Sequence, residues 1–115
     1  MNFIEYQALA HETADYPVCE VGGAVKVDYV YTALGLAEEA GEVSGKFAKA
    51  VRDSNGYISE ERKCEIIKEL GDVLWFVAEL ATNLGVSLET VAEGNIAKLK
   101  SRKERGVIHG SGDNR

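Results

Sequence analysis

The sequence has little proline and little cysteine, and it lacks any long apolar run. A single proline, Pro17, leaves most of the chain free to be helical. Cys19 and Cys64 are far apart and show no CxxC spacing, so we expect both thiols to be reduced. No apolar stretch approaches the roughly 20 residues that a membrane span requires, and the N-terminus lacks a signal-peptide core. We therefore expect a cytoplasmic protein without membrane contact.

The chain also lacks a general basic surface. Its formal charge of −6 argues against stable nucleic-acid binding. Acidic residues gather in the middle of the chain, and the basic residues near its end are Lys98, Lys100, Arg102, Lys103 and Arg105. A length of 115 residues with 45% hydrophobic content predicts one folded domain over residues 1–115.

Apolar residues recur at helical spacing and predict an all-α fold. The expected helices cover residues 2–13, 28–52, 59–84 and 87–105, with Asn2, Asp28, Ser59 and Ser87 as N-caps. Residues 14–27 are expected to form a loop, and residues 107–115 a polar tail. The third helix has an apolar seam of the kind found in antiparallel four-helix bundles, from Ile66 through Leu70 to Leu84.

The helix expected over residues 28–52 is apolar on two sides. One side carries Val30, Leu34, Gly41, Gly45 and Ala48, and the other carries Leu36, Ala40, Val43, Phe47 and Val51. A glycine in a helix interior costs roughly 1 kcal/mol, so Gly41 and Gly45 indicate the close approach of another helix or a ligand. A helix that is apolar on two sides must be covered on both. In so short a chain this predicts a homo-oligomer, either a dimer or a tetramer.

Five acidic residues form the most informative pattern: Glu38, Glu39 and Glu42 in the second helix, and Glu69 and Asp72 in the third. Residues three apart share a helix face, so Glu39 lies beside Glu42 and Glu69 beside Asp72. Like charges repel at that spacing, and a hard cation such as Mg²⁺ between the two pairs would remove the repulsion. Glu38 is expected inside the small-residue seam, where a carboxylate is costly unless it is paired, hydrogen-bonded or metal-bound. The pattern predicts a metal site but not a reaction.

Two segments carry a resemblance to a known family. Residues 35–43 (GLAEEAGEV), followed by residues 68–75 (KELGDVLW), resemble the MazG-type all-α nucleotide pyrophosphohydrolases, whose signature is EExxE, a spacer and ExxD. The resemblance extends over nearly the whole chain, including residues 95–102 and the tail. It implies an enzyme that uses Mg²⁺, or Mn²⁺ as a substitute, to hydrolyse a nucleoside triphosphate to a monophosphate and pyrophosphate. Cleansing of the nucleotide pool is the role that fits such an activity.

The same resemblance implies roles for individual residues. It makes Glu39, Glu42, Glu69 and Asp72 the metal ligands, and Glu38 the catalytic base or a ligand to a further ion. Asn95, Lys98 and Arg102 step by three and four along the last helix, so they form one stripe that can hold substrate phosphates.

Five further side chains carry expectations. Relatives often have a tyrosine four residues after the aspartate, but this chain has Phe76, which cannot donate a hydroxyl hydrogen bond to a phosphate. Lys46 is expected to pair with Glu42 one turn away. Trp75 is expected in the core. His11, like His109, has no second ligand at metal spacing and is expected at the surface.

Two alternatives remain open. A carboxylate-bridged di-iron bundle would use Glu-x-x-His motifs, and neither histidine here follows a glutamate by three. A non-catalytic helical assembly module would carry the same acids as a solvated face. Metal titration separates the module from an enzyme, because a solvated face would bind Mg²⁺ feebly.

Overall fold

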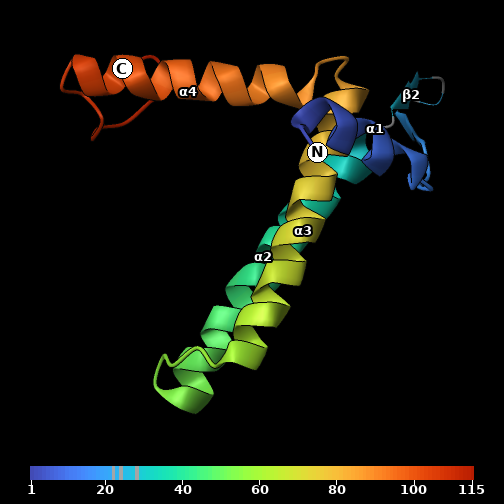
Figure 1. Cartoon of the computed structure of the whole chain (residues 1–115). Coiled ribbons are helices and arrows are strands. Elements are labelled where there is room, and N and C mark those ends of the chain that lie inside the picture. The colour runs from blue at the N-terminus through green and yellow to red at the C-terminus, as the bar shows by residue number, and fades with distance from the viewer. Residues whose placement is uncertain (22, 24, 28) are drawn as a thin grey trace.

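A computed structural model describes residues 1–21, 23, 25–27 and 29–115. Over these residues it contains helices α1 (Phe3–Glu12), α2 (Tyr29–Ser54), α3 (Glu60–Asn83) and α4 (Leu88–Glu104), and strands β1 (Cys19–Val21) and β2 (Val25–Val27), as Figure 1 shows. The predicted all-helical architecture with four helices is confirmed apart from the small hairpin. Asp28, the expected cap of the second helix, lies outside the described residues.

Local capping explains where three of the helices begin. The Asn2 side chain accepts the Glu5 backbone N–H at 2.9 Å, and the Glu5 carboxylate accepts the Asn2 N–H at 3.0 Å, which is a complete capping box. Ser59 and Ser87 each accept a backbone N–H three residues later, at 3.2 Å and 3.0 Å. Gly85 follows α3 with a φ of +72°, a conformation that glycine adopts without strain. These caps confirm the predicted starts of α1, α3 and α4, whereas α2 ends at Ser54, two residues beyond the predicted end.

The segment 14–27 is not entirely a loop, so that prediction is wrong for its second half. Strand β1 pairs antiparallel with β2, with Cys19 opposite Val27 and Val21 opposite Val25. Gly23, between the strands, has a φ of +76° and so suits a tight turn. Strands of three residues are too short to give a clear two-residue period in the sequence.

Helices α2 and α3 form a long antiparallel pair, and α1 packs against α3 (Figure 1). A small buried cluster comprises Ala10, Ala78 and Leu88, with Tyr6, Trp75 and Val77 packed against it. Ala50, Ile66 and Ala81 are buried as well. Helix α4 leaves the end of α3 at a steep angle and projects away from the pair (Figure 1). The radius of gyration is 17.4 Å, against about 13 Å for a compact domain of similar length. One chain therefore does not close a four-helix bundle by itself.

The close approach of α2 and α3 occurs at Gly35 rather than at the predicted glycines. A Cβ atom at Gly35 would overlap the ring of Phe76, so this glycine allows the ring to lie against α2. Among the described residues, no neighbouring atom lies within 4 Å of the Cβ position at Gly41 or Gly45. The buried residues of α2 are Thr32, Gly35 and Ala50, whereas Leu34 is 67% exposed. The helical period was predicted correctly, but α3 does not cover the side of α2 that carries Leu34, Gly41 and Gly45.

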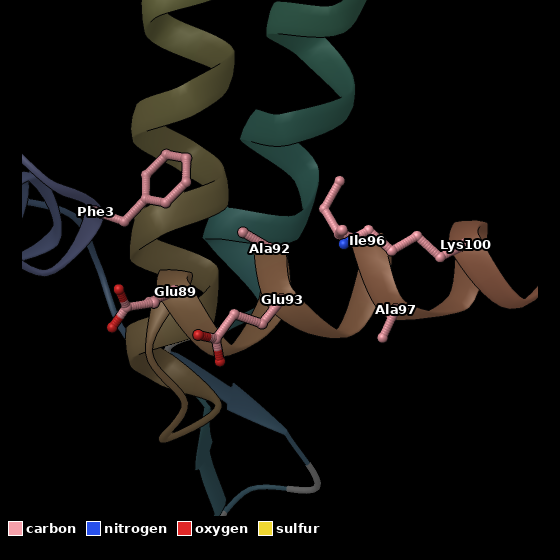
Figure 2. A pocket seen from close by; sticks show the side chains of 7 residues that line it. All are labelled: Phe3, Glu89, Ala92, Glu93, Ile96, Ala97 and Lys100. Carbon is pink, nitrogen blue, oxygen red and sulfur yellow. The ribbon is translucent and has the colours of Figure 1, made fainter.

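Apolar side chains remain uncovered on three helices. Those on α2 include Leu34, Phe47 and Val51, those on α3 include Ile67, Leu70 and Leu74, and those on α4 include Val91, Ile96 and Leu99. On the predicted α3 seam, Ile66 is buried, but Leu84 is exposed. An open groove of about 440 Å³ lies between α1 and α4, with Phe3, Ala92 and Ile96 among the residues that line it (Figure 2).

Two expectations from composition can be compared with the structure. Cys64 is a free, exposed thiol, as predicted, and the side chain of Cys19 lies outside the described residues. No helix in the described part of the chain is long and apolar enough to cross a membrane.

Candidate metal centre

Three carboxylates meet between α2 and α3. One oxygen each from Glu39, Glu69 and Asp72 lies within 4.8 Å of the others. Glu39 is half-buried on the face of α2 that α3 covers, and Glu69 and Asp72 are three apart on α3 and therefore share a face. The antiparallel pairing of the two helices thus brings together three of the four predicted metal ligands.

The electrostatics of this group show the cost of leaving it without a cation. Burial raises the pKa of Glu39 above its ordinary value, and the negative charges of Asp72, Glu38, Glu69 and Glu42 raise that pKa further. Ionised Glu39 is unfavourable here, so it destabilises the fold at pH values above its raised pKa. At pH values below that pKa the carboxyl is protonated and the repulsion is relieved. A bound cation would favour the ionised form and reverse this balance.

Glu38 and Glu42 stand apart from the three-carboxylate group. Both side chains are exposed, although both are near enough to raise the pKa of Glu39. The expectation that Glu38 lies in a buried seam is wrong, because α3 covers the face of α2 that carries Glu39. Successive helix residues are about 100° apart, so Glu38 projects to the side of the group.

Lys46 neutralises part of the acidic group. Its ammonium lies 3.4 Å from a carboxylate oxygen of Glu65 and 3.4 Å from one of Glu69. These contacts raise the pKa of Lys46, with the hydrogen bond to Glu69 as the largest cause. The expected pairing with Glu42 is wrong, because α3 offers two carboxylates within reach on the face that Lys46 occupies.

The three carboxylates fit a hard divalent cation. Mg²⁺ binds oxygen ligands at about 2.1 Å, so opposite ligands around it are about 4.2 Å apart. Adjacent ligands are about 3.0 Å apart, so the three oxygens, which lie within 4.8 Å of one another, would have to draw closer to surround one ion. The group contains no histidine, so its donor set does not match a di-iron site built on Glu-x-x-His.

The predicted phosphate-binding stripe lies elsewhere in the chain. Asn95, Lys98 and Arg102 are on α4, which projects away from the α2–α3 pair (Figure 1). Lys98 is 3.3 Å from the Asp113 carboxylate. Arg102 is buried, and its Nη2 donates to the Asp113 carboxylate at 3.1 Å and to the Asp113 carbonyl at 2.7 Å. Within one chain, the structure does not bring this stripe to the carboxylates.

A buried polar network was missed by the sequence reasoning. Glu79 is fully buried, and its Oε2 accepts the Tyr16 hydroxyl at 2.9 Å and lies 3.2 Å from Nδ1 of His11. Asn83 donates to the Tyr16 hydroxyl at 2.9 Å and accepts the Thr32 hydroxyl at 2.8 Å. His11 is 59% exposed, as expected, but its ring also reaches this network. The available signal was an acid at position 79 between apolar residues of α3.

Aromatic rings adjoin the network. Tyr16 stacks on Tyr31 at 5.5 Å, and Trp75 packs edge-on against both Tyr16 and Phe76. The Trp75 indole N–H donates to Thr13 at 2.8 Å, so the tryptophan tethers the end of α1 to α3. Its packing against the core agrees with its predicted role.

Comparisons with known proteins cover the same region. The family described as the MazG nucleotide pyrophosphohydrolase domain matches residues 29–107, well over half of the chain. The chain is 48% identical over 114 residues to the Gene 37 protein of Mycobacterium phage L5, with 96% of each chain covered. It is 41% identical over 78 residues to the uncharacterized protein YvdC of Bacillus subtilis (strain 168), with 60% of this chain and 70% of that protein covered. No solved structure gives a significant match.

Proposed function

Because the chain belongs to the MazG nucleotide pyrophosphohydrolase family, we propose that it is a Mg²⁺-dependent hydrolase that converts a nucleoside triphosphate to a monophosphate and pyrophosphate. The observation that carries the proposal is the group formed by Glu39, Glu69 and Asp72 within the matched region. The proposed role is cleansing of the nucleotide pool in the cytoplasm.

In this proposal Glu39, Glu69 and Asp72 hold the ion, together with Glu42 one turn along α2. The ion, Mg²⁺ or Mn²⁺ in its place, supplies positive charge to the triphosphate oxygens. Phosphoryl transfer requires positioning and charge neutralisation and little covalent chemistry from the protein, which suits a site built mainly of carboxylates.

The proposed base is Glu38. Its exposed carboxylate is adjacent in sequence to Glu39 and can accept a proton from the water that attacks the α-phosphorus. Asn95, Lys98 and Arg102 are the proposed substrate ligands, with the two cations holding phosphate oxygens. Since α4 projects away from the carboxylates of its own chain, we propose that a second copy supplies this stripe to each site.

The proposed enzyme is a homo-oligomer, a dimer or a tetramer. The large radius of gyration and the exposed apolar side chains of α2, α3 and α4 support this, because a large exposed apolar surface is typical of an interface between chains. Light scattering at micromolar concentration should give a mass at least twice the 12.5 kDa of one chain. A 12.5 kDa particle would contradict both the oligomer and the shared site.

Activity should depend completely on a divalent cation, because clustered carboxylates repel a triphosphate unless a cation lies between them. EDTA should abolish turnover, and excess Mg²⁺ should restore it, with Mn²⁺ as a partial substitute. Chromatography of the products should show a monophosphate and pyrophosphate. Release of a diphosphate and orthophosphate would place the attack at another phosphorus. Feeble Mg²⁺ binding without hydrolysis of any nucleotide would favour the non-catalytic assembly module.

A further inference from the structure

The C-terminal segment 107–115 folds back along the last turns of α4 (Figure 1). Its final side chain holds the fold-back in place: the Arg115 guanidinium donates to the carbonyls of Val107 at 3.3 Å, Ile108 at 3.1 Å and Gly112 at 2.6 Å. Gly110 has a φ of +144°, and a Cβ atom there would lie 2.9 Å from the Arg115 stem. Residues 107–115, which the sequence predicts as a polar tail, therefore form a defined loop.

This loop places a carboxylate on the cations of α4. The Asp113 carboxylate contacts both Lys98 and Arg102, at 3.3 Å and 3.1 Å. The hydrogen bond from Arg102 is the largest cause of a lowered pKa at Asp113, and Lys98 adds to it. Asp113 thus stays ionised down to a lower pH than an isolated aspartate.

The contact also controls access to Arg102. The arginine is 5% exposed because the loop covers it, and its Nε has no partner among the described residues. The Asp113 side chain, in contrast, is 82% exposed, so water competes for it. An anion cannot use the Arg102 guanidinium until the loop moves, and that movement is opposed by the contacts of Asp113 with α4 and by the hydrogen bonds of Arg115.

We propose that the segment 107–115 is an autoinhibitory strap, in which the Asp113 carboxylate occupies the place on Lys98 and Arg102 that a polyphosphate group of the substrate takes. This inference rests on the proposed assignment of these two cations to substrate phosphates. A polyphosphate carries more charge than one carboxylate and offers more oxygens to an arginine fork, so it can displace Asp113. The Asp113 carboxylate is exposed to water, which weakens its ion pairs, so the strap lowers affinity by about 2- to 10-fold.

Calorimetry with Mg²⁺ and inorganic tripolyphosphate tests the strap without requiring catalysis. Asp113→Asn removes the charge but keeps the shape of the side chain, and it should bind tripolyphosphate about 2- to 10-fold more tightly than the parent chain. Arg115→Gln, which loosens the loop without touching either cation, should shift affinity in the same direction. Glu104→Gln, an exposed acid near the end of α4, is the control for losing one negative charge and should change affinity by less than Asp113→Asn.

Hydrogen exchange supplies the second measurement. Amides of residues 107–115 should exchange faster when Mg²⁺ and tripolyphosphate are added, while those of α4 stay protected. Slower exchange in the loop, or weaker binding by Asp113→Asn, would overturn the strap and make Asp113 a residue that positions the cations. Equal affinities in all variants, or no tripolyphosphate binding by any of them, would also overturn it.

The strap and the proposed function fail in different ways. If the parent chain hydrolyses nucleotides with Mg²⁺ but Asp113→Asn keeps the parent KM, the proposed function holds and the strap is wrong. If the parent chain hydrolyses no nucleotide but Asp113→Asn binds tripolyphosphate more tightly, the strap holds and the proposed function is wrong.

Discussion

Glu38→Gln should lose about 10²- to 10⁴-fold in turnover while it binds Mg²⁺ and nucleotide almost normally, because removing a general base costs about that much. The structure supports a division of labour between neighbouring acids. Glu39 lies half-buried in the three-carboxylate group, and Glu38 is exposed and outside it. In the proposal Glu38 does not hold the ion, so Glu38→Gln should leave Mg²⁺ binding intact.

The measurement is calorimetry with a non-hydrolysable triphosphate analogue, set beside kcat for the same preparation. If Glu38→Gln instead loses metal affinity and recovers turnover in excess Mg²⁺, Glu38 is a ligand to a further ion and not the base.

Glu39→Gln should show the opposite pattern. Loss of a residue that supports a metal ligand typically weakens metal binding by about 10- to 100-fold, and loss of a ligand itself should cost at least as much. Turnover at limiting Mg²⁺ should fall by at least about 100-fold, and high Mg²⁺ should restore part of it. The amide should also stabilise the metal-free chain, because it removes the charge repulsion that raises the pKa of Glu39.

Glu65→Gln is the matched control for this substitution. Glu65 is an exposed acid of α3 that pairs with Lys46 but is outside the three-carboxylate group. Glu65→Gln should change Mg²⁺ affinity only slightly. The comparison therefore separates a specific effect of Glu39→Gln from a general loss of negative charge. Unchanged Mg²⁺ affinity in Glu39→Gln would remove Glu39 from the proposed ligands.

Tertiary contacts changed the interpretation of several polar residues that the sequence had singled out. The helical spacing predicts an ion pair between Lys46 and Glu42, yet Lys46 pairs with Glu65 and Glu69 on α3. Arg102 is predicted to bind substrate phosphates, yet the loop that carries Asp113 covers its side chain. Glu79 was not singled out at all, yet it anchors Tyr16 and His11. In each case the decisive partner is distant in sequence or belongs to a segment without periodicity.

The sequence by itself determined the helices, their caps and the pairs of acids that share a face, because these depend on side chains within four residues of one another. Only the tertiary structure decided which face of α2 meets α3, that Gly35 admits Phe76, and that α4 leaves the α2–α3 pair with the 107–115 loop folded over its cations. Several faces of α2 are apolar enough to pack, and composition cannot rank them. In the structure the Phe76 ring fits against Gly35 on the face of α2 that α3 covers, and the same pairing brings Glu39 to Glu69 and Asp72.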